Sequence, residues 1–246
     1  MGCLETGNQV HADIITHGLE HEPCIGSCII NMYSKCGNLQ DACAVFAKFP
    51  RKNVILWNTI ITGYLEHNHG EEVLSTLEEM QVKGINPDRI SYMSALRACS
   101  DLLALEEGRR FHSVIAEKGF DVHLSIKNTL IDMYGKCGSL TDAYNLVTMV
   151  CFVDIVSWNA IIAGYARQGQ SESVFDLFVE IIEKGIRPNH ITFLGALSAC
   201  SHAGLVDVIL YYFMAMESSH GFAPLISHFN CMLDAFARAG QFNEAV

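Results

Sequence analysis

The residues best suited to chemistry are the ten cysteines and eleven histidines of this 246-residue chain. A zinc site needs thiolates or imidazoles at compact spacings, yet no Cys-x-x-Cys pair occurs, and Cys24 and Cys28 are spaced too widely for one. A zinc deaminase needs His-x-Glu followed by Pro-Cys-x-x-Cys. His69-Gly70-Glu71 matches the first half, but Pro23-Cys24 lies upstream of it. We therefore expect reduced, mostly buried thiols and neither a metal site nor a catalytic site in this chain.

Other classes of function are disfavoured in the same way. The sequence contains no phosphate-binding loop, dinucleotide fingerprint or nucleophile elbow, so we expect no cofactor and no small-molecule substrate. The apolar segment 205–216 is too short to span a membrane and contains Asp207. The formal net charge of −11 argues against nucleic acid, because phosphate binding usually leaves a basic footprint.

Internal repetition is the strongest signal in the sequence. Three separate blocks return at a single offset of 101 residues, which chance does not explain. The blocks are 31–37 with 132–138, 57–64 with 158–165, and 95–100 with 196–201.

Shorter units lie within this long period. Gly84 with Pro87, and Gly185 with Pro188, each end a helical pattern. Two amphipathic stretches, about 57–67 and 71–83, are separated by a polar break at 68–70 and predict a helix–turn–helix unit. One such unit cannot bury its apolar face alone, so it must stack on its neighbours. We expect an all-α fold, a right-handed α-solenoid that forms one domain over 1–246.

The repeated blocks resemble a known family. Asn-Met-Tyr-Ser-Lys-Cys-Gly at 31–37, Trp-Asn-Thr-Ile-Ile at 57–61 and Ala-Leu-Arg-Ala-Cys-Ser at 95–100 resemble plant pentatricopeptide repeat proteins, in the subclass that alternates long and short motifs. The resemblance covers the whole chain, and 197–206 looks like the last triplet before the family's C-terminal extension. Both ends fall inside motifs, so a longer protein is expected. The implied motifs are 1–22 (partial), 23–53, 54–88, 89–123, 124–154, 155–189, 190–225 and 226–246 (partial).

The resemblance implies that single-stranded RNA binds at one base per repeat. In the family, the fifth and last residues of a motif contact the Watson–Crick edge of the base. A side-chain amide at the fifth position suits this role, because it donates and accepts hydrogen bonds in one plane. The implied pairs are Ser27 with Asn53 for adenine, Asn58 with Asp88 and Asn128 with Asp154 for uracil, and Asn159 with Asn189 for cytosine with tolerance for uracil.

The long motifs lack such pairs. They offer Met93 with His123 and Leu194 with Leu225, and neither Met nor Leu can hydrogen-bond a base edge, so we expect spacers there. The last motif contributes Asn230, without a closing residue. Family members bind RNA with its 5′ end at the protein's N-terminus, so the resemblance implies 5′-A-U-n-U-(C/U)-n-3′.

Two further motif positions carry implied roles. The second position flanks the base with an apolar face, as Ile55 and Val156 would, together with Ile90 and Ile191 of the long motifs. Short-motif residues Cys24, Ser125 and Ser227 depart from this pattern. The thirteenth position lies near the phosphate path and holds Lys35, Lys136, Arg167 and Arg238, but Glu66, Asp101 and His202 elsewhere. Four cations in one groove would partly offset the argument from net charge, because the local electric field matters more for binding than the total charge of the protein.

Simpler interpretations compete with these. Asn58, Asn128 and Asn159 could cap their helices, since Asn is a favoured N-cap. Trp57 and Trp158 are expected to pack in the core rather than stack on bases. The alternative function is a protein-binding scaffold similar to tetratricopeptide proteins. A second alternative is that this chain has too few repeats to bind RNA alone.

The resemblance also sets expectations for the whole protein. It implies the recognition part of an organellar RNA-editing or RNA-processing factor in a chloroplast or mitochondrion, with editing-complex proteins as partners. An import signal would precede the present sequence, and a deaminase extension would follow it.

Overall fold

Helices make up the computed structural model, which describes residues 2–20, 22–148 and 154–240. This part of the chain contains fourteen α-helices, one short 3-10 helix and no strand. The expected all-α helical-repeat solenoid is thereby confirmed. The helices are α1 (Gly2–Thr16), α2 (Pro23–Lys35), α3 (Leu39–Lys48), α4 (Val54–Glu66), α5 (Gly70–Val82), α6 (Arg89–Asp101), α7 (Leu105–Glu117), η1 (Phe120–Val122), α8 (Leu124–Lys136), α9 (Leu140–Thr148), α10 (Ile155–Arg167), α11 (Ser171–Glu183), α12 (His190–Ala203), α13 (Val206–Ser218) and α14 (Ile226–Ala239).

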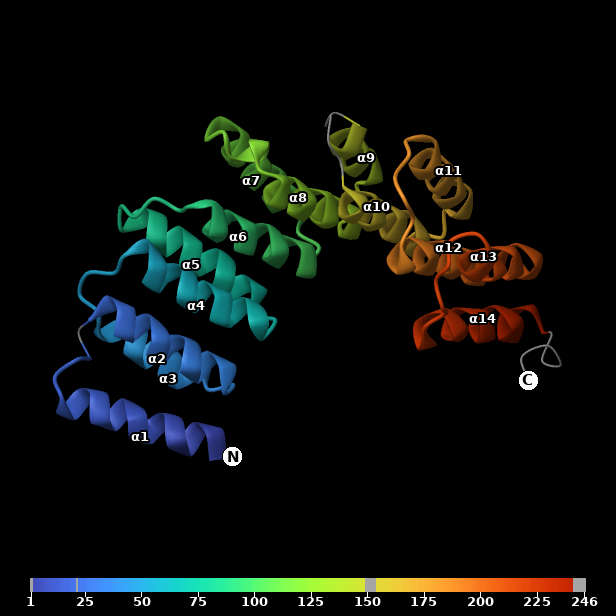
Figure 1. Ribbon diagram of the computed structural model, residues 1–246. Coiled ribbons are helices and arrows are strands. Elements are labelled where there is room, and N and C mark those ends of the chain that lie inside the picture. The colour runs from blue at the N-terminus through green and yellow to red at the C-terminus, as the bar shows by residue number, and fades with distance from the viewer. Residues whose placement is uncertain (1, 21, 149–153, 241–246) are drawn as a thin grey trace. The chain divides into compact units, whose positions relative to one another are not determined.

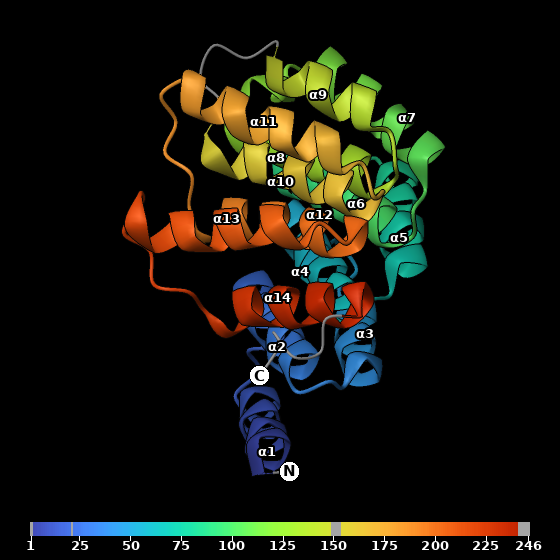
Figure 2. The same cartoon turned by 90° about the vertical axis from the view of Figure 1, so that its right-hand side faces the viewer.

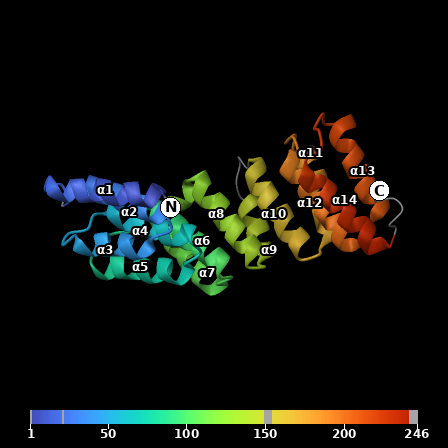
Figure 3. The ribbon, with the colours of Figure 1, turned by 90° about the horizontal axis from the view of Figure 1, so that it is seen from below.

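The chain forms two compact units, Met1–Ile126 and Lys127–Val246. In the first unit, α2, α4 and α6 pack against one another in order, and α3, α5 and α7 each pack on the helix that precedes them. Figures 1 and 3 show these as successive helix pairs, with α3, α5 and α7 on one side of α2, α4 and α6. The second unit repeats the scheme, since α10, α12 and α14 pack in order and α11 and α13 each pack on the preceding helix (Figure 2).

The turns that end the second helices follow from glycine and proline. After α5, Gly84 adopts a φ of 76°, and Ile85 N–H donates to the Met80 carbonyl at 3.0 Å. Gly185 ends α11 in the same way with a φ of 73°. A side chain other than hydrogen is strained in this left-handed region, which explains glycine here. Because a proline follows each turn, the next helix begins only after Asp88 or Asn189.

The first helix of the unit begins earlier than the amphipathic pattern indicates. The pattern predicts a start at Trp57, whereas α4 begins at Val54. The reason is Asn53, whose side chain accepts a hydrogen bond from Leu56 N–H at 3.0 Å and caps the helix.

The core lies between the two rows of helices, and the repeated aromatic residues belong to it. Trp57 and Trp158 have 0% and 1% of their surface exposed. Trp57 meets Phe46 edge to face with ring centroids 4.9 Å apart. The expected packing role of both tryptophans is confirmed, because side chains this buried cannot stack on a base.

The recurring cysteines also contribute to packing. Cys99 and Cys200 are buried, and burial raises the pKa of Cys200 to about 12, while Cys36 and Cys137 are half-buried. Among the described residues, no three His, Cys, Asp or Glu side chains gather as metal ligands would. None of the described helices is long and apolar enough to cross a membrane.

Candidate nucleic-acid interface

The residues predicted to close the reading motifs are the N-caps of the helices that follow. Asn53, Asp88, Asp154 and Asn189 cap α4, α6, α10 and α12, and each side chain accepts a backbone N–H from the first turn. The alternative in which Asn58, Asn128 and Asn159 are the caps is therefore wrong. Those three residues lie fifth in α4, α8 and α10, one turn inside each helix.

The fifth residue and the closing residue of a motif meet in space. Asn58 Nδ2 donates to Asp88 Oδ1 at 3.0 Å, and Asn159 Nδ2 donates to Asn189 Oδ1 at 3.1 Å. Asn128 Nδ2 lies 3.5 Å from Asp154 Oδ2. Because α4 packs on α6, and α10 on α12, residues about thirty positions apart become neighbours. The stacking thus builds one amide-containing pair at each of three junctions.

A third residue, which is not among the residues predicted from the sequence, joins each of these pairs. Ser91 Oγ donates to Asn58 Oδ1 at 2.6 Å, and Thr192 Oγ1 donates to Asn159 Oδ1 at 2.7 Å. Ser157 Oγ makes the same bond to Asn128 Oδ1. The available signal was a hydroxyl residue three positions after each closing residue, which is the spacing of a capping box.

Hydrogen bonding keeps the closing carboxylate charged. Burial by itself would raise the pKa of Asp88, but the Ser91 backbone N–H, the Asn58 amide and the Ser91 hydroxyl donate to it and hold the pKa below its ordinary value. Asp88 is therefore an anion at neutral pH and can only accept hydrogen bonds. These bonds end on Oδ1, and none of them uses Oδ2.

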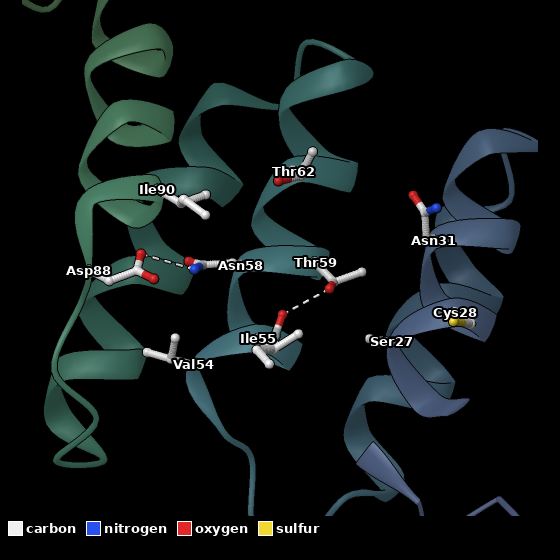
Figure 4. A pocket seen from close by; sticks show the side chains of 10 residues that line it. All are labelled: Ser27, Cys28, Asn31, Val54, Ile55, Asn58, Thr59, Thr62, Asp88 and Ile90. Carbon is white, nitrogen blue, oxygen red and sulfur yellow. Dashed lines mark hydrogen bonds between the residues drawn. The ribbon is translucent and has the colours of Figure 1, made fainter. Parts of the chain in front are cut away.

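A pocket of about 410 Å³ opens beside this pair (Figure 4). It is formed by α2, α4 and the start of α6, and the predicted reading residues Ser27, Asn58 and Asp88 all line it. Ile55 and Ile90 also line it, and Figure 4 shows them on either side of the Asn58–Asp88 contact. The pocket therefore combines polar hydrogen-bonding groups with apolar walls.

The second-position residues are exposed although they are apolar. Ile55 has 60% of its surface exposed and Val156 has 55%. Ile90 and Ile191 are exposed to a similar degree. Water-exposed branched side chains beside buried amides are what a planar apolar ligand would cover.

The Ser27–Asn53 pair is built differently. Ser27 Oγ donates to the carbonyl of Cys24, one turn earlier in its own helix, at 2.8 Å. Asn53 uses its side-chain oxygen to cap α4. The position that holds Ser or Thr at the three asparagine junctions holds Leu56 here, which is buried. Among the hydrogen bonds of the described chain, none connects Ser27 with Asn53.

The residues at the expected spacer positions of the long motifs, and the predicted reader Asn230, stand apart from such junctions. Met93 and Leu194 are half-buried, and Leu225 is exposed. His123 faces Arg89, with Nδ1 3.4 Å from the guanidinium. Asn230 is exposed on α14.

The predicted phosphate-proximal cations are exposed, but carboxylates accompany most of them. Lys35 pairs with Glu66 of the next motif. Lys136 lies 3.0 Å from Asp132 and Arg238 lies 2.9 Å from Asp234, each one turn away on the same helix. Arg167 forms no ion pair within the described residues. The expected row of four cations is therefore largely compensated, which weakens its answer to the net charge.

The residues of the partial deaminase motif serve the helical repeat. His69 precedes α5 as its N-cap residue, and its ring lies 3.2 Å from Glu72 rather than facing Glu71. Cys24 is exposed in the first turn of α2.

Family models match most of the chain. The model described as the PPR repeat family matches residues 52–101 and 153–202, and the model described as the PPR repeat matches 27–54, 126–149 and 227–246. The two matches of the first model lie 101 residues apart, which is the offset of the repeated blocks.

Curated relatives from Arabidopsis thaliana match over the chain's full length. A pentatricopeptide repeat-containing protein named as chloroplastic is 39% identical over 99% of this chain and 33% of its own length. One named as mitochondrial is 38% identical over 99% of this chain and 32% of its own length. The chain thus spans about a third of the relatives it matches.

Solved structures agree in fold. The pentatricopeptide repeat protein PPR10, in complex with an 18-nt psaJ RNA element, superposes with a TM-score of 0.64 at 20% identity, covering 89% of this chain and 38% of that one. Together with the family models and the relatives that match over the whole of this chain, this agreement confirms the resemblance to pentatricopeptide repeat proteins. The chain belongs to the pentatricopeptide repeat family.

Proposed function

We propose that this chain binds single-stranded RNA and distinguishes bases at the junctions of Asn58, Asn128 and Asn159. The observation that carries the proposal is the repeated pair of fifth and closing residues, beside exposed apolar residues that would cover the faces of a base. The PPR10 structure of the same fold was solved with an RNA element.

The fixed polarity of the closing residue supports the assignment of bases. Asp88 is a charged acceptor with Oδ2 available, which complements the N3–H donor of uracil. Asn189 accepts backbone N–H groups from Ile191 and Thr192 on Oδ1, so its NH2 group is the free end. That group is a donor, which complements the unprotonated N3 of cytosine. We therefore assign uracil to the Asn58–Asp88 junction and cytosine to Asn159–Asn189.

The proposed site 5′-A-U-n-U-(C/U)-n-3′ follows from these assignments, and its positions are expected to differ in how much they contribute to specificity. The three junctions with asparagine carry the specificity. Adenine at Ser27 and Asn53 is the weakest element, because those two side chains are not joined. Met93 and Leu194 act as spacers.

For the whole protein, we propose that it belongs to the subclass that alternates long and short motifs, and that it acts in organellar RNA editing or processing. The names of the Arabidopsis relatives support a chloroplast or mitochondrion. Editing-complex proteins are the proposed partners, and any catalytic step would belong to a part of the protein outside this sequence or to a partner.

A gel-shift series tests base reading directly. The RNA carries the proposed site, and each assigned base is replaced in turn, with the unassigned positions as controls. We expect the replaced uracils and cytosine to weaken binding about tenfold each, the effect of roughly 1.4 kcal/mol, and the spacer positions to have little effect. Equal binding of every variant would contradict sequence-specific reading, and no binding to any RNA would favour the protein-scaffold alternative.

A further inference from the structure

The hydroxyl residues at the three junctions share a particular geometry. Ser91, Ser157 and Thr192 are almost fully buried, and each occupies the third position of the motif that follows a reading asparagine. Each hydroxyl lies within hydrogen-bonding distance of the closing residue's Oδ1, but its shorter contact is to the amide oxygen of that asparagine.

The closing residue and the hydroxyl together set the direction of this hydrogen bond. The closing oxygen accepts from the asparagine NH2 group, at 3.0 Å for Asp88 and 3.1 Å for Asn189, so the asparagine oxygen is turned toward the hydroxyl. The hydroxyl oxygen accepts the backbone N–H of the closing residue, from Asp88 at 3.1 Å and from Asn189 at 3.0 Å. Its proton has the asparagine oxygen as its nearest acceptor, at 2.6 Å for Ser91 and 2.7 Å for Thr192. The asparagine NH2 group then faces the closing residue and the pocket.

The flipped amide would lose its carboxylate partner. Its oxygen would face the Asp88 carboxylate, so two acceptors would oppose each other. Its NH2 group would face the Ser91 hydroxyl, which would have to turn its proton from the 2.6 Å contact with Asn58 to the 3.1 Å contact with Asp88 Oδ1. Asn58 is 8% exposed and Asn159 is 6% exposed, so little water is available to compensate, and an unmet polar group at such depth is costly.

The sequence of the chain shows the same association. The third position holds Ser or Thr at the junctions of Asn58, Asn128 and Asn159. At the other junctions it holds Leu56 opposite Ser27, Ile126 opposite Met93 and His228 opposite Leu194. If the hydroxyl served only the capping of the next helix, it would have no reason to accompany asparagine alone. Asn53 caps α4 without it.

We infer that Ser91, Ser157 and Thr192 are positioning residues that hold each reading asparagine in one amide orientation, so that it offers an N–H donor to the base. This inference rests on the proposed RNA binding. It adds a third residue to each reading junction and assigns that residue a role in discrimination. A base must then present an acceptor to the asparagine. At Asn58, uracil does so with O4 while its N3–H faces the Asp88 carboxylate, whereas cytosine presents an amino donor at that atom. At Asn159, where the closing residue offers a donor, cytosine meets the two amides with its O2 and N3 acceptors.

The first test compares Ser91→Ala with Ser100→Ala. Ser100 is a matched control, because it lies in the same helix, is buried and has no hydrogen-bond partner for its hydroxyl among the residues that the structure describes. Affinities are measured for RNAs with uracil or cytosine opposite Asn58. We expect the uracil-to-cytosine preference to fall about three- to tenfold in Ser91→Ala, the range that one hydrogen bond gives. Ser91→Thr should restore it, as Thr192 does at its own junction, and Ser100→Ala should retain it.

The second test needs no RNA and separates this inference from the proposed function. In NMR spectra, the side-chain amide protons of Asn58 should exchange slowly with water in the wild type and in Ser100→Ala, and faster in Ser91→Ala. Unchanged exchange in a folded Ser91→Ala protein, or an unchanged uracil preference in that variant, overturns the inference. If the wild type binds no RNA, but its Asn58 amide protons exchange more slowly than those of Ser91→Ala, the proposed function is contradicted. The inference that Ser91 holds the Asn58 amide in one orientation is then still supported.

Discussion

Each reading junction is a small hydrogen-bonded network at the scale of single residues. The closing residue caps a helix with one atom and holds an asparagine with the same atom, so capping and the proposed base recognition share a side chain. Substituting a closing residue therefore affects stability as well as binding, unless the replacement also caps. Asn and Asp are near-equal N-caps, which makes their exchange informative.

Asp88→Asn should change the preferred base at this junction. The substituted amide still caps α6 and still accepts from Asn58, but its free end becomes a donor, as at Asn189. We expect the uracil-to-cytosine affinity ratio to shift about tenfold towards cytosine, equivalent to roughly 1.4 kcal/mol. Competition gel shifts with the two RNAs measure this ratio. Glu71→Gln, which removes the same charge from an exposed position, is the control and should leave the ratio unchanged.

At the scale of helices, the close approach of two backbones sets the spacing between α8 and α10, the helices that carry the proposed base-reading residues Asn128 and Asn159. A Cβ atom at Gly164 of α10 would lie 2.8 Å from Leu140 Cδ2 and 3.3 Å from the Gly135 Cα of α8. Glycine is unfavourable inside a helix, so its presence here reflects contact rather than propensity. The distance between α8 and α10 in turn allows Asn128 to reach Asp154.

Gly164→Ala tests this spacing. In an open helix the change would stabilise the protein by about 0.5–1 kcal/mol, but here the added methyl has no room. We expect the free energy of unfolding in urea to fall by about 1–3 kcal/mol, the usual effect of overpacking. Val156→Ala, at an exposed position of the same helix, should change it much less. A gain of stability in Gly164→Ala would show that α8 and α10 can separate without cost.

At the scale of the whole molecule, the net charge of −11 opposes binding of a polyanion. The repeats place cations at several thirteenth positions, yet Lys35 is engaged by Glu66, which occupies the thirteenth position of the next motif. An exposed pair of this kind contributes little to stability, but it reduces the positive field that an RNA phosphate would meet.

Glu66→Gln should therefore strengthen RNA binding. Freeing Lys35 removes a negative charge and leaves one more cation for a phosphate. We expect higher affinity at low salt, and a plot of log K against log salt that is steeper by about 0.7, the slope for one phosphate of a single strand. Affinities measured over a series of salt concentrations give this slope. Glu71→Gln changes the total charge equally, and an equal effect from it would assign the gain to net charge rather than to Lys35.

The sequence by itself determined the repeat and the helix pairs, because these depend on local rules. Hydrophobic spacing places the helices, and Gly84 and Gly185 end them. The fifth and closing positions came from the family resemblance and cannot be derived from local patterns. Even there, the caps were assigned to Asn58 and its equivalents as an alternative, since propensity alone does not say which of two polar residues begins a helix.

Only the tertiary structure decided which side chains meet. Asn58, Asp88 and Ser91 come together because α4 packs on α6, and no local pattern connects residues 30 and 33 positions apart. The same stacking brings Glu66 to Lys35 and turns an expected free cation into an ion pair. Contacts between repeats depend on the rise and rotation from one helix pair to the next, which packing sets. The family resemblance thus indicated the proposed reading asparagines, while the hydroxyl groups beside them became apparent only in the fold.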